Sequence, residues 1–325
     1  MTISFRNLKT ALVCRLGTVS LMLALMAMTL NIALAKDDQS AASAPTSGQA
    51  NVQALEALAL LRQAKLPAEP MIEKVDNGAI DWTHGKAIAR GEGKAVGTSA
   101  QQVEMAQRAA RLAAARNAIL LMGNIRVSGS GRSLDVAHAN IQVDAVLHGF
   151  EEVSASFDPK TRTASVELAV PLYGAKGVIR LWGAKLPATA SPGESQTRPA
   201  VQAAPSVIVI DARSANIKPC LLPRILKDKT ADVLFAPSAA GLDDHPAAIY
   251  VTLPPSDRKS GKDDDMLKAL PASALVLRAK TPDDKTPGAI VLDAEETAKL
   301  QANGDAPQLL TQGRMIIVTS SPSKP

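Results

Sequence analysis

The sequence is poor in aromatic residues. Tryptophan, tyrosine and phenylalanine together make up only 2% of the 325 residues. Proteins that bind single-stranded nucleic acid stack bases on aromatic side chains, so this composition argues against such a partner. The core must instead be built from valine, isoleucine, leucine and alanine.

Cysteine and histidine are scarce as well. Of the two cysteines, Cys14 lies in an N-terminal leader, which leaves Cys220 without an intrachain disulfide partner. The four histidines are not paired at metal-ligand spacing, and no HExxH motif is present. They are His84, His138, His148 and His245. The sequence therefore predicts no metal site.

Motifs of catalysis are missing too. There is no G-x-S-x-G nucleophile elbow, and Asp263–Asp265 lacks the alternating acidic pattern of a calcium loop. The sequence thus predicts no catalytic residues, no cofactor and no enzymatic activity. An envelope hydrolase remains the least favoured alternative, because catalytic groups converge in space rather than in sequence.

The first 35 residues have the pattern of a secretory signal peptide. Arg6, Lys9 and Arg15 precede an apolar run over residues 19–34, and Ala33-Leu34-Ala35 is a small-x-small cleavage site. We predict cleavage after Ala35 and a periplasmic location, the alternative being an uncleaved anchor.

The leader also bears on lipid attachment and on charge. Cys14 precedes the apolar run, so it is not placed for lipid attachment. The mature chain would keep 33 basic and 31 acidic residues, and this near balance predicts no nucleic-acid partner. No later stretch is apolar enough to predict a membrane span.

Composition divides the remaining chain into four parts. A Ser/Ala/Gln-rich tether and a short helix precede a first domain, and a Pro/Ala-rich linker leads to a second. The predicted ranges are 1–35 for the signal, 36–71 for tether and helix, 72–183, 184–205 for the linker, and 206–320.

The first domain is predicted to be α+β. Residues 100–122 form the strongest helical pattern, with alanines on one stripe and Gly123 at its end. Alternating segments at 134–147, 153–157 and 163–170 predict strands, the last two joined by a hairpin turn. A helix packed on a mainly antiparallel sheet results.

The second domain is predicted to be a smaller, β-rich α+β domain. Short apolar runs predict five strands, and Asp293 caps a short helix that ends near Ala302. The predicted strands are 207–212, 247–253, 274–280, 289–292 and 315–319.

The stretch Gly91-Glu92-Gly93 raises the question of phosphate binding, because it lies between a predicted strand and a helix. The dinucleotide spacing lacks its third glycine, no Gly-Lys-Ser/Thr follows, and no acidic ribose partner appears about twenty residues later. We interpret the glycines as a flexible turn at the helix entry.

Two charged constellations remain as candidate sites. Asp81, Trp82, Arg90 and Glu92 surround the glycines, and Asp211, Arg213 and Lys218 lie where the first strand of the second domain ends. Each set either stabilises a turn or contacts a partner. Trp82 is expected to be buried and to anchor the first domain.

The residues around both sets resemble a known family. "AIDWTHGKAIARGEG" and the Ala/Arg-rich segment behind it resemble bacterial envelope proteins of the Lpp-twenty lipoprotein type, with the flagellar assembly proteins FlgP and FlgT at its edges. The segment "IVIDARSANIKPCLLPRIL" resembles longer members of that family. The matching positions include Ile80, Asp81, Trp82, Gly91, Gly93, Arg126, Asp211, Arg213, Lys218 and Pro219.

This resemblance implies an envelope location and a structural or assembly role without catalytic residues. The lipidated cysteine of the family is missing here, and Ser214 and Cys220 stand where glycine and alanine are usual. We therefore expect an exported, non-enzymatic protein whose partners are envelope or flagellar proteins or a second copy. The alternative is a periplasmic small-molecule-binding module that uses the sheet face or the glycine turn.

Overall fold

The computed structural model describes residues 47–128, 131–132, 150–174, 176–179, 205–228, 232–237, 245–254, 266–282, 286 and 288–320. All of them belong to one compact unit, Thr46–Pro325. The strand expected over 134–147, the linker up to residue 204 and the acidic run 263–265 lie outside these ranges. The domain boundaries expected from composition stay predictions.

The first sheet is antiparallel throughout. Its strands lie in the order β2 (Ile72–Val75), β3 (Gly78–Asp81), β4 (Lys86–Lys94), β8 (Thr163–Pro171) and β7 (Glu151–Asp158). The predicted hairpin joins β7 to β8, and the Asp158 carboxylate accepts bonds from Lys160 and Thr161 in the turn. A short ribbon of β5 (Arg126–Ser128) and β6 (Gly131–Arg132) follows the helix.

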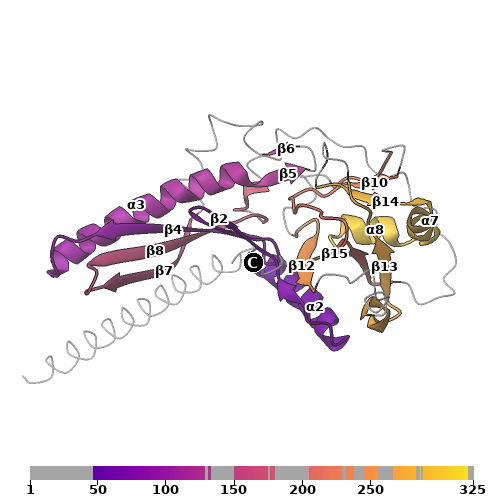
Figure 1. The fold of residues 1–325 in the computed structure, drawn as a ribbon, viewed down its shortest axis with the longest axis horizontal. Helices are drawn as coiled ribbons and strands as arrows, with labels where there is room; N and C mark the ends of the chain where they lie inside the picture. Colours follow the sequence, from indigo (N-terminus) through magenta and orange to yellow (C-terminus); the bar gives the residue numbers. More distant parts are fainter. Residues whose placement is uncertain are drawn as a thin grey trace, which may run out of the picture. The chain divides into compact units, whose positions relative to one another are not determined.

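One long helix, α3 (Ala100–Asn124), covers this sheet along β4 and β8 (Figure 1). Ser99 caps it in a capping box with Gln102, and it extends two residues beyond the expected end at Met122. Its buried stripe includes Ala106, Ala110, Ala114 and Ala118. A helix on an antiparallel sheet confirms the predicted α+β class.

The glycine pair is not a turn, which corrects our interpretation. Gly91 and Gly93 lie inside β4, against the backbone of α3. A Cβ at Gly91 would meet the backbone nitrogen of Ala114 at 2.1 Å, and one at Gly93 would meet the Ala106 carbonyl oxygen at 2.1 Å. The glycines therefore let the helix backbone rest on the strand, and they leave no room above them for a phosphate.

The second sheet is mostly parallel. Its order is β1 (Glu69–Pro70), β12 (Ile249–Leu253), β15 (Met315–Ser320), β9 (Val207–Asp211) and β13 (Ala274–Arg278), with only β1 antiparallel to its neighbour. The four long members match predicted strands.

Smaller elements complete this half. A three-stranded sheet contains β11 (Val233–Phe235), β10 (Ile225–Lys227) and β14 (Ile290–Leu292). The helices are α7 (Ala294–Ala302), α8 (Ala306–Thr311) and the 3-10 turn η3 (Leu267–Ala269). Asp293 caps α7 by accepting a bond from Glu296 N, which confirms the predicted cap.

The N-terminal helix belongs to the second sheet. Helix α2 (Ser47–Gln63) covers the region that was expected to be helical before Pro67. Its residues Ala57, Leu58 and Leu61 share a core with Val209, Ile249, Val251, Ile316 and Val318. The chain thus enters this sheet through α2 and β1, builds the first sheet, and then returns.

Candidate functional site

Trp82 lies where the first half of the protein, formed by the antiparallel sheet and α3, meets the second half, formed by the mostly parallel sheet and the elements around it. Its side chain is 2% exposed, as expected, and its indole N–H donates to Glu73 at 2.9 Å. The Arg126 guanidinium lies 5.7 Å from the Trp82 ring centroid, pairs with Glu73, and donates to the Pro219 carbonyl at 2.7 Å. The ring of Tyr250 meets Trp82 edge-on at 6.0 Å between centroids.

Asp81 shapes the turn that places this tryptophan. Its carboxylate accepts from the backbone N–H of Thr83 at 3.1 Å and of His84 at 2.9 Å, and it pairs with the His84 ring at 2.8 Å. The Thr83 hydroxyl donates to the Tyr250 carbonyl across the junction. Of the two roles considered for Asp81, this geometry provides the turn-stabilising one.

Arg90 lies on β4 rather than in a turn. It faces Glu167 of β8, with 2.5 Å between Nη2 and Oε1, and this hydrogen bond lowers the pKa of Glu167. The Arg90 side chain is 63% exposed, so the ion pair adds little stability and Arg90 stays within reach of another molecule.

Asp211 and Arg213 form an ion pair at the carboxyl end of β9. Arg213 donates to both carboxylate oxygens, at 2.9 and 2.8 Å, and the Arg213 side chain is only 1% exposed. A buried guanidinium requires such a partner, and it cannot be reached by another protein. Lys218, in contrast, is exposed.

The structure brings together some of the predicted residues but not all. Trp82 meets the segment of Lys218 and Pro219 through Arg126, whereas Arg90 pairs with Glu167 and Asp211 pairs with Arg213. Our sequence reasoning assigned no role to Glu73, Arg126 or Tyr250. Of these three residues, Arg126 could have been selected from the sequence, because it is one of the positions that match the Lpp-twenty motif.

Cys220 is buried beside the Tyr250 hydroxyl, with 3.8 Å between Sγ and Oη. Burial raises the pKa of its thiol to about 11, so the thiol is protonated at neutral pH and inert. We expect iodoacetamide to modify Cys220 rapidly only after unfolding. Peptide mass spectrometry at pH 8, with and without urea, checks this; rapid native labelling would contradict it.

The same shift gives a dependence of stability on pH. Between about pH 9 and 11 the unfolded thiol loses its proton while the folded thiol keeps it, so the folded state binds more protons. The free energy of unfolding should therefore fall as pH rises through this window. Replacement of Cys220 by alanine should reduce the slope near pH 9–10, whereas Tyr173 and Tyr250, whose pKa values burial also raises, continue to lower the stability above about pH 10.

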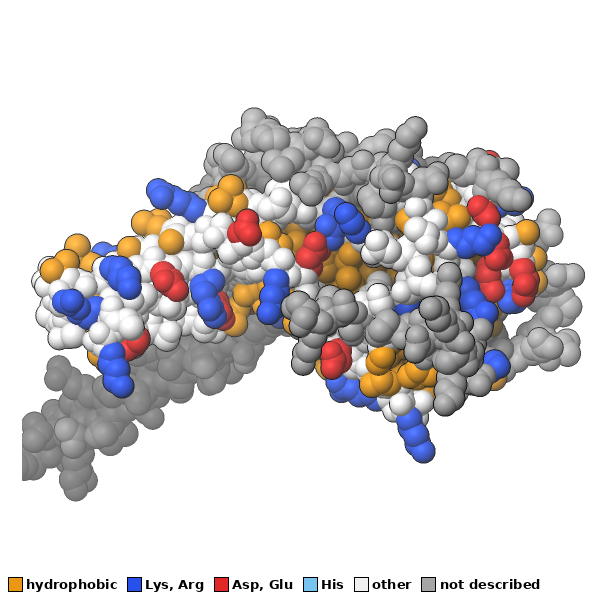
Figure 2. All heavy atoms as spheres, viewed as in Figure 1, with side chains coloured by type: hydrophobic (Ala, Val, Ile, Leu, Met, Phe, Trp, Pro, Cys, Tyr) orange, Lys and Arg blue, Asp and Glu red, His pale blue; other side chains and the backbone are white. Residues whose placement is uncertain are grey.

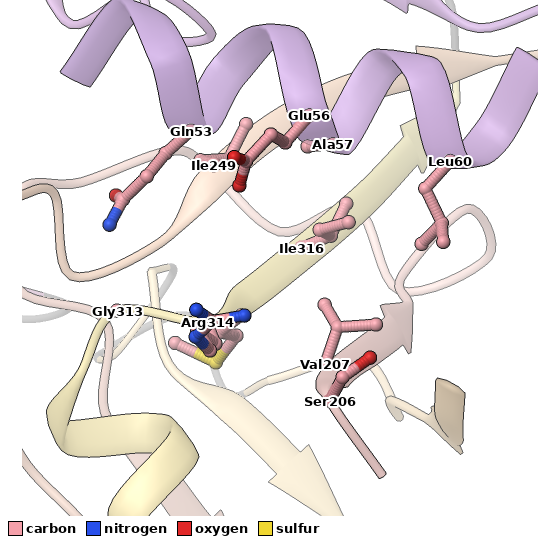
Figure 3. Close-up of a pocket in the computed structure, with 11 residues that line it drawn as sticks. Gln53, Glu56, Ala57, Leu60, Ser206, Val207, Ile249, Gly313, Arg314 and Ile316 are labelled. Atoms are coloured by element: carbon pink, nitrogen blue, oxygen red, sulfur yellow. The ribbon is translucent and has the colours of Figure 1, made fainter. Parts of the chain in front are cut away.

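Among the described residues, the second sheet borders at least two cavities. The first, of about 180 Å³, is a cleft between α2 and the starting ends of β9, β12 and β15 (Figure 3). The second, about 590 Å³, is an open groove beside β13. In that groove the Glu296 carboxylate accepts hydrogen bonds from the Arg278 backbone N–H and from Lys299. The charges of Glu296 and Lys299 are therefore paired with each other.

The described residues show no assembled metal centre. No three His, Cys, Asp or Glu side chains in these ranges gather closely enough to hold a metal ion. Across the same ranges, every helix is too short or too polar to pass through a membrane.

The second half of the chain matches a known protein family. Residues 207–321 match the family model described as the second domain of Treponema pallidum Tp0624. The match includes β9 through β15, and so it includes Asp211, Arg213 and Lys218. It fits a two-domain bacterial protein. No curated protein matches the chain.

Proposed function

We propose that this chain is an exported, non-enzymatic envelope protein with a structural or assembly role, associated with the flagellum. The Lpp-twenty resemblance supports this proposal. Three residues of its first motif, Asp81, Trp82 and Arg126, form hydrogen bonds within the protein, as residues with a structural role do. The periplasmic location is part of the same proposal and depends on the signal pattern before residue 36.

The observation that carries the proposal is strand β7, which is the last strand of the first sheet among the residues that the structure describes. Seven of its eight residues are exposed, and only Phe157 is partly covered. An exposed edge strand can pair with a strand from another chain. Glu151, Glu152 and a bulge after Glu152 protect its beginning, which leaves the uncharged part at 154–157 as the pairing segment.

The outer face of α3 offers a second contact surface. Met105, Leu112 and Leu120 are 63%, 67% and 61% exposed. Their spacing of seven and eight residues places them on one side of the helix, opposite the alanine stripe. Orange side chains are visible among basic ones along this part of the molecule (Figure 2). These side chains are about two helical turns apart and form a row along the helix, where a partner segment lying along α3 would contact all three.

We expect a photo-cross-linker attached at β7 to capture an envelope protein or a second copy. Ser156→Cys provides the attachment point, because Cys220 is buried; Cys14 is replaced by serine. Adding Ala155→Lys should abolish the products, since a charge in the edge segment opposes strand pairing. Cross-linked peptides from an envelope extract are identified by mass spectrometry.

The matched control is Thr98→Cys, at an exposed position in the loop before α3. Products at β7 that are absent at Thr98 and lost with Ala155→Lys support strand pairing. Equal products at both positions, or none at β7, contradict the edge assignment. Turnover of a periplasmic metabolite by the purified protein would contradict the non-enzymatic role.

A small-molecule-binding module remains the second candidate. The glycine turn expected to serve it is filled by α3. The cleft between α2 and the second sheet is a different place where a small molecule could bind, and it supports this second candidate function.

A further inference from the structure

The cleft beneath α2 is lined by both aliphatic and polar side chains. Leu60, Val207 and Ile316 provide aliphatic surface from the helix and two strands. Gln53 and Glu56 extend from α2 toward the sheet, and Arg314 lies on the opposite wall at the start of β15 (Figure 3). Ile249 lies beside Glu56, and Ser206 lies beside Val207 (Figure 3), so aliphatic surface runs along the cleft while its charged groups, Glu56 and Arg314, come from opposite walls.

Gln53 provides the first indication of a ligand. Its Oε1 atom is shielded from solvent and has no hydrogen-bond partner among the described residues. Leaving a buried acceptor unpaired costs about 1–3 kcal/mol. If the Gln53 amide turns so that this oxygen faces the cleft, a ligand with an N–H donor removes this cost.

Glu56 and Arg314 provide the second indication of a ligand. Both side chains line the cleft and are solvent-exposed, and neither has a hydrogen bond or ion pair with any described residue. A guanidinium recognises a carboxylate through paired hydrogen bonds. A carboxylate beside an amide oxygen, at Glu56 and Gln53, offers acceptors only, which suits an ammonium group.

We propose that this cleft binds a free aliphatic α-amino acid. Its carboxylate pairs with Arg314, its ammonium group donates to Gln53 and Glu56, and its side chain packs against Leu60, Val207 and Ile316. The volume fits, because an engineered apolar cavity of about 150 Å³ holds benzene and this cleft is about 180 Å³. This activity is additional to the assembly role and independent of β7.

Calorimetric titration of the purified protein tests the proposal with four probes. L-leucine carries all three recognised groups; isocaproate lacks the ammonium group, isoamylamine lacks the carboxylate, and glycine lacks the aliphatic part. We expect L-leucine to bind and each of the others to bind at least about tenfold more weakly, which corresponds to about 1.4 kcal/mol per lost contact.

Three variants assign the contacts. Arg314→Gln and Glu56→Gln should each lower leucine affinity at least about tenfold. Gln53→Leu should lower the affinity without lowering the melting temperature, because it removes an unpaired buried oxygen. Arg116→Gln, on exposed α3 surface, is the matched control and should bind leucine as the wild type does.

The overturning results are distinct. The proposal fails if L-leucine gives no heat at millimolar concentration, if isocaproate and isoamylamine bind as tightly as leucine, or if Arg314→Gln leaves the affinity unchanged. Circular dichroism melts verify that each variant is folded. None of these results bears on cross-linking at β7, so the two proposals succeed or fail separately.

Discussion

Replacing Gly91 by alanine should destabilise the protein by about 3 kcal/mol, although the change adds one methyl group. That methyl would lie 2.1 Å from Ala114 N and 2.3 Å from Ala110 O. Both obstacles are helix backbone, so α3 must lift from β4 to admit it. Overpacking of this kind costs about 1–3 kcal/mol and occasionally more. Urea unfolding followed by circular dichroism measures the loss.

Gly304 provides the matched control. A Cβ there would meet no atom within 4 Å, so Gly304→Ala should leave the stability unchanged or raise it by about 0.4–1 kcal/mol through the unfolded state. The same small gain applies at Gly91 and is outweighed by the clash. If Gly91→Ala proved as stable as Gly304→Ala, α3 would not rest on β4 as described.

Replacing Trp82 by alanine should cost about 3–5 kcal/mol. The indole is 2% exposed, contacts Tyr250 edge-on, and is covered by the Arg126 guanidinium. Removing it leaves a cavity and also takes a donor from Glu73. Because the missing contacts join the two halves, both should lose stability together in one urea transition followed by circular dichroism.

Trp82→Phe separates packing from hydrogen bonding. The phenyl ring keeps most of the buried surface but cannot donate to Glu73, so we expect a smaller loss of about 1–3 kcal/mol. Near-wild-type stability of Trp82→Ala would show that the junction does not depend on this ring. Equal losses in the two variants would show that the hydrogen bond, rather than packing, dominates.

Local patterns in the sequence were enough to predict most of the elements. The alanine stripe of α3, the Asp293 cap and the turn after Asp158 depend on residues within a few positions of one another. Such interactions act before any tertiary contact forms, so they can be inferred without knowledge of the fold.

The candidate sites were harder to predict because they depend on distant segments. The glycines of β4 look like a turn in one dimension, and only the helix above them shows why a side chain is excluded. Arg213 appeared to be accessible, yet its burial follows from the sheet around it. The meeting of Trp82 with Pro219 through Arg126 joins segments more than a hundred residues apart, a distance that no local pattern encodes.

The path of the chain limits how this protein can be divided. The segment that matches Tp0624 begins at residue 207, but the sheet it forms is completed by β1 and covered by α2, which precede it by more than a hundred residues. A fragment of 207–321 alone would expose Val209, Ile316 and Val318 to water. The second half therefore cannot be transplanted as a cassette: any fusion or domain exchange must carry residues 47–70 with it.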